Sequence, residues 1–490
     1  MLKKLSRFNP RLINDSHYKW WAYSAIAIGT FTSVADNGSA SIALPSIASH
    51  FDTDLSTAQW IVTGYLLVIA SMLLPMGRFA DIIGRKPVYL SGFVIMSLSA
   101  IAAGFSQNVE TLIATRTIQG IGAAMTQGTA MAMNISAFPQ NQRGQIIGMH
   151  VSVVGAGAVA GPPIGGLVLG ILGWQSVFWV TGVLALLGLL AASLIIDKRS
   201  EVSRSKNQSF DWVGASLSTL GLVLFLLTIS YAPKIGWTSP FILSAIPIVI
   251  VIIGVFIRWE LRTQTPLLDV RMFQSKIFSI GIASKFILFI GMSGIRFLMP
   301  IFLQGIIGMS PAKMSLMFIP GALMMVSGST ISGKLSDKYG WKRLSILGLS
   351  FNIIGLSMLA FVNMNTSYWY VLLAIFTQSL GHTFFGPPND SSILGETPTE
   401  KQASVTSLIN LTRNAANVVG IGLATAIVVA VMAYNGQQAE MRSVVESGNL
   451  NIQHAFVAGV QYTYFVASGL AIIAMAFTIF KASSSKTSTN

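Results

Sequence analysis

The sequence predicts an all-α integral membrane protein with fourteen membrane-spanning helices. Its 490 residues are 52% hydrophobic and only 10% charged, whereas soluble domains carry about 25% charged residues. The apolar stretches are about 20 residues long or longer, which is the length of helix that crosses ~30 Å of hydrocarbon. A membrane β-barrel would show shorter segments with alternating apolar and polar residues.

The charges on the loops test this count of helices. The expected spans are 20–49, 57–76, 87–106, 109–137, 144–170, 175–196, 212–232, 240–260, 278–305, 312–332, 343–362, 368–394, 403–433 and 456–480. Of the 31 lysines and arginines, 24 then lie on the side that holds both chain ends, and three lie on the other side (Lys234, Lys313 and Arg442). Since lysine and arginine accumulate in cytoplasmic loops, both ends are predicted to be cytoplasmic.

Asp36 lies in the middle of the first expected span, with no basic residue beside it in sequence. A carboxylate at the bilayer centre costs roughly 2.5–3.5 kcal/mol on insertion scales, so those that occur usually have a function. We expect Asp36 to be a proton or ion site that faces an internal cavity. The alternative is a packing residue paired with a basic side chain on another helix.

Two loops of the chain repeat one pattern. Gly77–Lys86 reads Gly-Arg-Phe-Ala-Asp-Ile-Ile-Gly-Arg-Lys, and Gly333–Lys342 reads Gly-Lys-Leu-Ser-Asp-Lys-Tyr-Gly-Trp-Lys, 256 residues further on. Both loops follow an even-numbered span, which indicates two parallel six-helix halves with two helices inserted between them. The predicted domains are therefore residues 1–196, the insertion 197–277, and residues 278–481, followed by a disordered tail at 482–490.

Four motifs resemble those of one transporter family. Gly77–Lys86 resembles the signature loop of the major facilitator superfamily, and the run from Arg116 to Gly122 resembles the motif of its fourth helix. The run from Gly157 to Gly166 is similar to the fifth-helix motif of its drug antiporters. Asp36, followed by Ala43-Leu44-Pro45, resembles the first helix of its fourteen-helix drug:proton antiporters of the EmrB/QacA type.

This resemblance implies the major facilitator fold and proton-coupled export by alternating access. Asp36 and Arg116 are the predicted proton-coupling residues, because arginine stays protonated and can bias a neighbouring carboxylate. The predicted cytoplasmic gate comprises Gly77, Asp81, Gly84, Arg85, Lys86 and Asp337. The predicted antiporter motif comprises Gly157, Gly161, Pro162, Gly165 and Gly166. The predicted substrate cavity comprises Trp60, Tyr65, Gln119, Met125, Arg296 and Gln304.

The chain also departs from this family. Gly38 and Ser41 stand where polar residues commonly follow the first-helix aspartate, residues 320–329 of the tenth span contain no acid, and Arg296 stands where an apolar residue is expected. The main hypothesis is a multidrug exporter of amphipathic or lipophilic compounds. One alternative is a dedicated proton-coupled exporter of a lipid, siderophore or natural product, whose substrate could be an anion. A remote alternative is a membrane-embedded enzyme or sensor.

Composition limits the other partners. The chain has no cysteine, which excludes disulfides and thiolate metal sites, and its five histidines show no metal-site spacing. The net charge of +14 is scattered over short loops, so nucleic-acid binding is not predicted. We expect no enzymatic activity, cofactor or metal. We expect a monomer in the cytoplasmic membrane of a prokaryote, whose ligands are small molecules and protons.

Overall fold

The structure is a computed structural model that describes residues 17–139, 142–196, 210–263, 266–398, 402–437, 444 and 449–483. All regular elements within these ranges are helical. The long helices are α3 (Tyr18–His50), α5 (Trp60–Ile83), α6 (Arg85–Ala103), α7 (Val109–Ala137), α8 (Arg143–Leu172), α9 (Trp174–Ile195), α10 (Trp212–Ile235), α11 (Pro240–Arg262), α12 (Lys276–Ile301), α14 (Ile319–Tyr339), α15 (Trp341–Ala360), α16 (Tyr368–Gly395), α17 (Gln402–Tyr434) and α19 (Leu450–Ser483).

Each predicted span has a long helix, so the predicted fold class is confirmed. Short elements separate some of them: α4 (Leu55–Ala58), the 3₁₀ helix η3 (Val270–Gln274), the π-helix η4 (Phe302–Ile306) and α13 (Pro311–Leu316). Eleven of the described helices are long and apolar enough to cross a membrane. The three long helices outside that set, α3, α7 and α16, contain the buried charges Asp36, Arg116 and Asp390.

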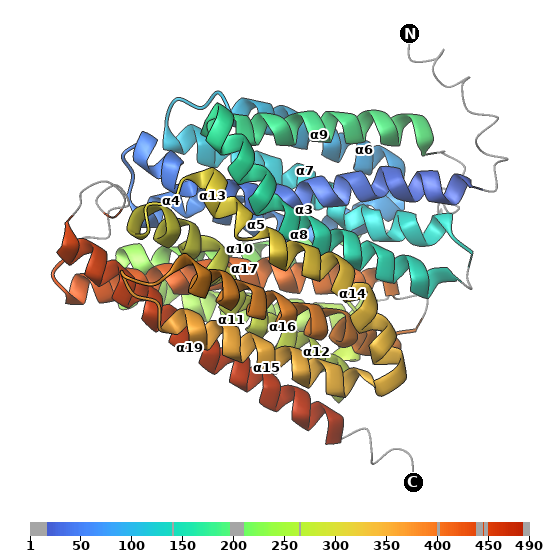
Figure 1. Ribbon diagram of the computed structural model, residues 1–490. Helices are drawn as coiled ribbons and strands as arrows, with labels where there is room; N and C mark the ends of the chain where they lie inside the picture. The colour runs from blue at the N-terminus through green and yellow to red at the C-terminus, as the bar shows by residue number, and fades with distance from the viewer. Residues whose placement is uncertain are drawn as a thin grey trace.

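The long helices form two groups that lie side by side (Figure 1). In the first, α3 packs on α8 and α9, and α7 packs on α5 and α6; in the second, α12 packs on α17 and α19, and α15 packs on α16 and α19. The groups meet where α5 contacts α17, where α8 contacts α13 and α14, and where α3 contacts α12. Any site between the groups is therefore bordered by these helices.

The helix α10 docks on the seam between the two groups, where α5 meets α17. Pro75 has no N–H, so the carbonyl of Ser71 lacks its usual helical donor, and the Thr219 hydroxyl of α10 donates to that carbonyl over 3.2 Å. The Gln59 side chain donates to the Ser230 carbonyl of α10 and accepts from Thr425 of α17. The helix α11 packs on α10 and η3. This arrangement supports the division into two halves and an insertion, which stays a prediction.

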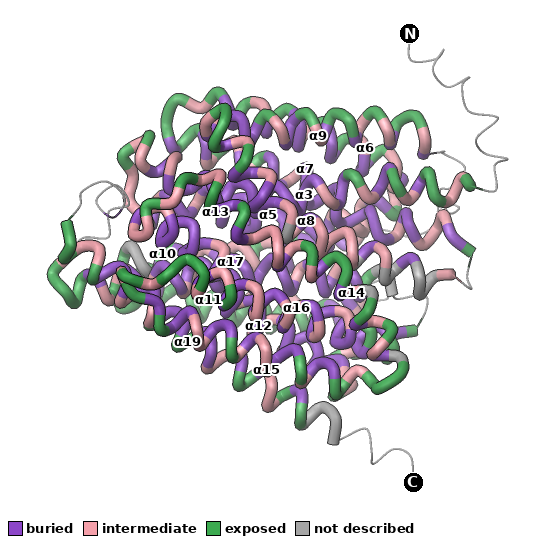
Figure 2. The backbone as a smooth tube through the Cα atoms, viewed as in Figure 1, coloured by how far each residue is buried: buried purple, intermediate pink, exposed green. Residues whose placement is uncertain are grey.

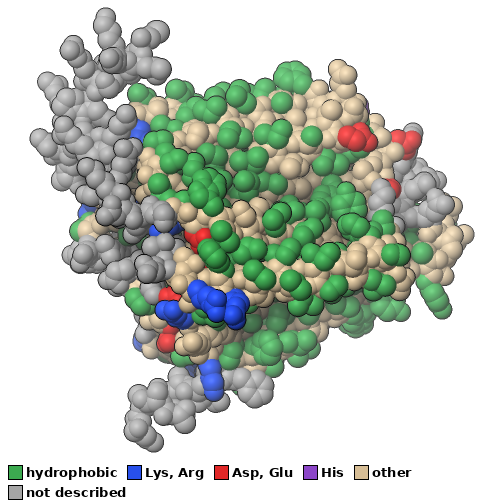
Figure 3. Space-filling model, turned by 180° about the vertical axis from the view of Figure 1, so that it is seen from behind, with side chains coloured by type: hydrophobic (Ala, Val, Ile, Leu, Met, Phe, Trp, Pro, Cys, Tyr) green, Lys and Arg blue, Asp and Glu red, His purple; other side chains and the backbone are tan. Residues whose placement is uncertain are grey.

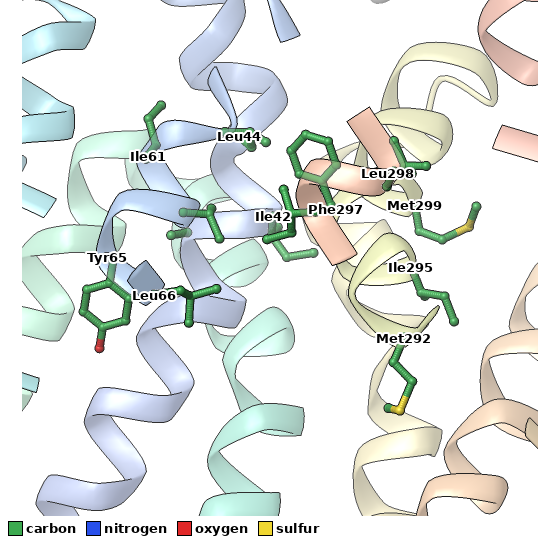
Figure 4. Packing of buried hydrophobic residues seen from close by; sticks show 14 of the residues in the cluster. Ile42, Leu44, Ile61, Tyr65, Leu66, Met292, Ile295, Phe297, Leu298 and Met299 are labelled. Atoms are coloured by element: carbon green, nitrogen blue, oxygen red, sulfur yellow. The ribbon is translucent and has the colours of Figure 1, made fainter. Parts of the chain in front are cut away.

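Buried apolar side chains hold the two groups together. One continuous cluster contains Ile42 and Leu44 of α3 together with Ile295 and Leu298 of α12 (Figure 4). Exposed residues lie on the outer helices and at their ends (Figure 2). Many of them are large and apolar, and in the space-filling view they form a broad apolar surface with few charges (Figure 3). An apolar exterior of this kind suits contact with lipid.

Glycines with positive φ lie in both repeated turns, and prolines lie inside helices at the centre of the molecule. The turn between α5 and α6 has Gly84 at φ 119°, and the turn between α14 and α15 has Gly340 at φ 84°, a region that favours glycine. Prolines lie inside three helices that meet at the centre: Pro45 in α3, Pro162 in α8 and Pro300 in α12. Each removes one helical hydrogen bond.

The predicted orientation can be tested by cysteine labelling, since the chain has no cysteine of its own. The exposed residue Thr238 lies in the turn before α11, and the exposed residue Gln274 ends η3, in the segment between α11 and α12. Thr238→Cys should react with a membrane-impermeant maleimide in intact cells, and Gln274→Cys should react only after permeabilisation. The opposite pattern would contradict the predicted orientation.

Candidate functional site

A buried ion pair joins the first and fourth helices of the first group. Asp36 of α3 accepts from Nη1 of Arg116 of α7 at 2.5 Å, and both side chains are fully buried. Both are predicted proton-coupling residues, and the structure brings them into direct contact. The structure therefore shows Asp36 paired with a basic residue of another helix, and its role as a proton site stays a prediction.

The surroundings of Arg116 fix its position. Its Nε donates to the Ile61 carbonyl over 3.1 Å, and its Nη1 also donates to Oε1 of Gln119 over 2.8 Å. The guanidinium lies 4.3 Å from the centre of the Tyr65 ring. Three buried polar atoms of this cluster nevertheless have no hydrogen-bond partner among the described residues, namely Asp36 Oδ1, Arg116 Nη2 and Gln119 Nε2. The cluster is therefore held in place but has unused hydrogen-bonding capacity.

The antiporter motif brings α8 close to α3 beside Asp36. Gly157, Gly161 and Gly165 lie against Phe31, Ala35 and Ser39 of α3, with the same spacing of four residues on both helices. A Cβ at Gly161 would collide with the Ala35 carbonyl oxygen. The Ser39 hydroxyl donates to the Gly161 carbonyl over 2.8 Å. Small residues at this spacing allow two helix backbones to approach closely.

The remaining motif residues face the second group. A Cβ at Gly166 would collide with Ser315 of α13. Pro162 packs against Gly38 and lines a pocket between the two groups. The motif residues of α8 therefore contact both α3 and the second group. The contact with the second group lies near the C-terminal end of α3.

Two adjoining pockets lie between the groups, and Gly38, Ala158 and Arg296 line both of them. The larger pocket, with a cavity volume of about 50 Å³, is mostly apolar. Its apolar lining includes Ile42, Met292, Ile295, Phe318, Met325 and Ile375. The smaller pocket, with a cavity volume of about 20 Å³, is lined mostly by polar residues and is called the polar pocket below. Its polar lining is Ser33, Asn37, Tyr65, Gln127, Arg296, Arg413, Asn414 and Asn417.

Four basic residues lie inside the spans, and the structure separates them into two kinds. Arg116 is paired with Asp36, and Lys285 of α12 is paired with both oxygens of Asp390 of α16 at 2.6 and 2.8 Å. Arg296 and Arg413 form no ion pair with a described residue, and both line the polar pocket. Arg413 lies within an expected span, but the sequence pattern indicates no role for it.

The other predicted cavity residues are distributed more widely. Tyr65 and Arg296 line the pockets, whereas Gln119 belongs to the Asp36–Arg116 cluster. Trp60 packs against Tyr231 of α10, with ring centres 4.8 Å apart. Met125 packs with Ala80 and Val88 near the predicted gate. Gln304 donates to the Ile42 carbonyl over 3.2 Å and so bridges the two groups.

The predicted gate loop is held by interactions within the first group. Asp81 pairs with Arg85 at 2.9 Å, and Arg85 also donates to the Ala132 carbonyl of α7. Lys86 donates to the Ile196 carbonyl, and Gly77 lies close to the Gly128 carbonyl. The side chain of Asp337 lies outside the described residues. The role of these residues as a cytoplasmic gate stays a prediction.

Comparison with known proteins agrees with this architecture. The family model "Major Facilitator Superfamily" matches residues 26–228 and 212–421. The chain belongs to the major facilitator superfamily and is an integral membrane transporter, not an enzyme. The solved structure of a bacterial homolog of the human lysosomal transporter Spinster superposes with a TM-score of 0.67 at 16% identity, and the match covers 96% of this chain and 98% of that one.

Relatives with curated names are transport and resistance proteins. The riboflavin transporter RibZ of Clostridioides difficile is 28% identical, and the match covers 94% of this chain and 97% of the relative. The tetracenomycin C resistance and export protein of Streptomyces glaucescens is 27% identical, and the match covers 94% of this chain and 91% of the relative. The lincomycin resistance protein LmrB of Listeria monocytogenes is 26% identical, and the match covers 92% of this chain and 94% of the relative. The chain is similar to drug-resistance transporters along most of its length.

Because Asp36 and Arg116 form a buried ion pair, removing one charge should destabilise the protein more than removing both. Arg116→Gln leaves Asp36 as an uncompensated buried charge, and breaking a buried pair in this way costs about 3–5 kcal/mol. The double variant Asp36→Asn/Arg116→Gln has no buried charge at this site and should regain most of that stability. Thermal unfolding of the purified proteins measures this difference. A double variant less stable than Arg116→Gln would exclude the ion pair as the cause.

The close contact of α8 and α3 predicts different effects of adding a methyl group at two glycines of one helix. Gly161→Ala should destabilise the protein by about 1–3 kcal/mol, as overpacking does. Gly155→Ala is the matched control, because a Cβ there meets nothing within 4 Å. Unfolding temperatures of both variants in the same detergent provide the measurement. Equal stability of the two variants would show that the helices can separate without cost.

Proposed function

We propose that this protein is a proton-coupled exporter of amphipathic small molecules that works by alternating access. The observation that carries the proposal is the fully buried Asp36–Arg116 pair. Asp36 lines a cavity between α3, α8 and α9, and Arg116 packs on Tyr65, which lines the smaller pocket between the two halves. A titratable group inside the membrane marks a proton or ion pathway. The names of the relatives, which include export and resistance proteins, support the direction of transport.

The ion pair offers a physical route from protonation to movement. When Asp36 takes up a proton, Arg116 loses its counter-charge and becomes a buried, unpaired cation, which is unfavourable by several kcal/mol. Arg116 also binds Gln119 and the Ile61 carbonyl of α5. The protonated state therefore favours a different arrangement of α3, α5 and α7. Substrate release and proton uptake are coupled if they favour the same arrangement.

The second candidate is a dedicated transporter of one natural compound. A riboflavin transporter is 28% identical to this chain, with matching length. The two candidates differ in the range of substrates and not in the proposed coupling. Competition between chemically unrelated compounds in one transport assay separates them. Mutual inhibition supports a multidrug exporter, whereas inhibition by flavins alone supports the dedicated transporter.

We also propose that the protein is a monomer in the cytoplasmic membrane of a prokaryote, with both ends in the cytoplasm. The loop charges support this orientation.

Asp36→Asn should abolish transport driven by a pH gradient, because the amide imitates the protonated state and cannot ionise. Proteoliposomes with an imposed gradient, loaded with lincomycin or with riboflavin, measure this loss. The variant should still insert and fold, although Arg116 loses its counter-charge. A variant that accumulates substrate at the wild-type rate would show that Asp36 is structural.

Asp52→Asn is the matched control. Asp52 is exposed in the turn after α3 and has φ 50°, a conformation that asparagine also tolerates. This change removes the same charge outside the membrane-spanning part. Transport by Asp52→Asn should remain within about twofold of the wild type. An equal loss in both variants would indicate a general effect of charge and not coupling at Asp36.

A further inference from the structure

Two cations face the same central pocket without a counter-ion among the described residues. Arg296 of α12 and Arg413 of α17 both line the polar pocket. Neither forms an ion pair with a described residue, and no aspartate or glutamate is among the described residues that line either central pocket. The Arg413 side chain is only 7% exposed. Its Nη2 donates to Oε1 of Gln127 over 3.3 Å, which is a neutral partner.

The nearby acids are already occupied. Asp36 is bound by Arg116 and lines a different pocket, between α3, α8 and α9. Asp390 attracts Arg413 at longer range, but both of its oxygens are bound by Lys285. An unpaired cation in the membrane interior is expensive, and proteins usually pair it. Within the described part of the chain, two of the four cations inside the spans are paired and two face one cavity.

We propose that Arg296 and Arg413 form an anion-binding subsite for the carboxylate, phosphate or sulfonate group of an amphipathic substrate. This inference rests on the proposed function, and it specifies the substrate class as anionic. A guanidinium binds such groups through charge-assisted and often bidentate hydrogen bonds. The substrate supplies the missing counter-charge, which makes an anion a better ligand here than a cation.

The two pockets match the two parts of such a molecule. The polar pocket adds amide side chains beside the arginines, including Asn37 and Asn414, and the Asn37 Oδ1 atom has no hydrogen-bond partner among the described residues. The adjoining pocket is lined by Met292, Phe318 and Ile375, and the chemistry of this lining suits apolar groups. Arg296 lines both, so the anionic group would bind at the junction. A neutral compound would use the apolar pocket alone.

Arg413 also gives the subsite a connection to both halves of the molecule. It lies on α17 of the second group and binds Gln127 on α7 of the first. An anion bound between Arg296 and Arg413 competes with Gln127 for the guanidinium. Binding is therefore linked to a contact between the halves.

A pair of matched dyes tests the proposal. The anionic probe is 1-anilinonaphthalene-8-sulfonate, and the neutral probe is N-phenyl-1-naphthylamine, which lacks only the sulfonate. Their affinities for the purified protein in nanodiscs are measured by thermal stabilisation, using the soluble fraction after heating. Wild-type protein should bind the sulfonate at least about tenfold more tightly, since one charge-assisted hydrogen bond has that effect. Equal affinities, or no binding of the sulfonate, would overturn the proposal.

Variants assign the preference to the two arginines. Arg296→Gln and Arg413→Gln should each reduce the affinity for the sulfonate about tenfold or more, while the affinity for the neutral dye changes less than twofold. Arg296→Lys and Arg413→Lys should keep part of the preference. Lys313→Gln removes the same charge from an exposed position of α13 and should change neither affinity. Equal losses for both dyes would indicate damage to the fold and would overturn the assignment.

Two further ligands distinguish a substrate subsite from a site for inorganic anions or for organic cations. If sodium sulfate at the same concentration stabilises the protein as strongly as the dye, the site binds inorganic anions only, and the substrate assignment fails. Tetraphenylphosphonium bound more tightly than the sulfonate would also overturn it. Asp36→Asn should retain the preference for the sulfonate even where pH-driven transport is lost. Failure of coupling and failure of the anion subsite therefore give different results.

Discussion

The buried ion pair between Asp36 and Arg116 is the constraint on which the first half of the molecule depends. A carboxylate and a guanidinium removed from water are stable only while they remain in contact. The pair therefore fixes how α3 and α7 are placed, and Arg116 extends the constraint to α5 through the Ile61 carbonyl. The glycines of α8 pack against α3 beside the pair, at Phe31, Ala35 and Ser39. Movement of α3 requires that the charge state of the pair change or that the pair move as a unit.

The second half contains a similar pair with the signs exchanged. In the first half the acid is on the first helix and the base on the fourth; in the second half Lys285 is on the first helix, α12, and Asp390 is on the fourth, α16. Arg116 lies near the start of α7, whereas Asp390 lies near the end of α16. The pocket between the two groups contains two further cations, Arg296 and Arg413, which form no ion pair with a described residue.

The helices and several residues of the site could be predicted from the sequence alone. The side chains that these residues contact could not. The length of the apolar stretches predicted every long helix, because that length is fixed by the bilayer. Asp36 and Arg116 were identified because a charge in a span is costly wherever it lies. Their contact, 80 positions apart, depends on the rotation of two helices about their axes. The same uncertainty explains why Trp60 and Met125 face other helices, and why Arg413 was not assigned to the cavity.

The prolines of the central helices have a consequence for substrate recognition. A proline at position i leaves the carbonyl at i−4 without its helical donor, so Pro45, Pro162 and Pro300 free the carbonyls of Ser41, Ala158 and Arg296. All three residues line the larger central pocket. The freed carbonyls therefore belong to residues that border this pocket, and as backbone acceptors they do not depend on side-chain identity. A pocket lined in this way can bind the polar groups of substrates that differ in shape.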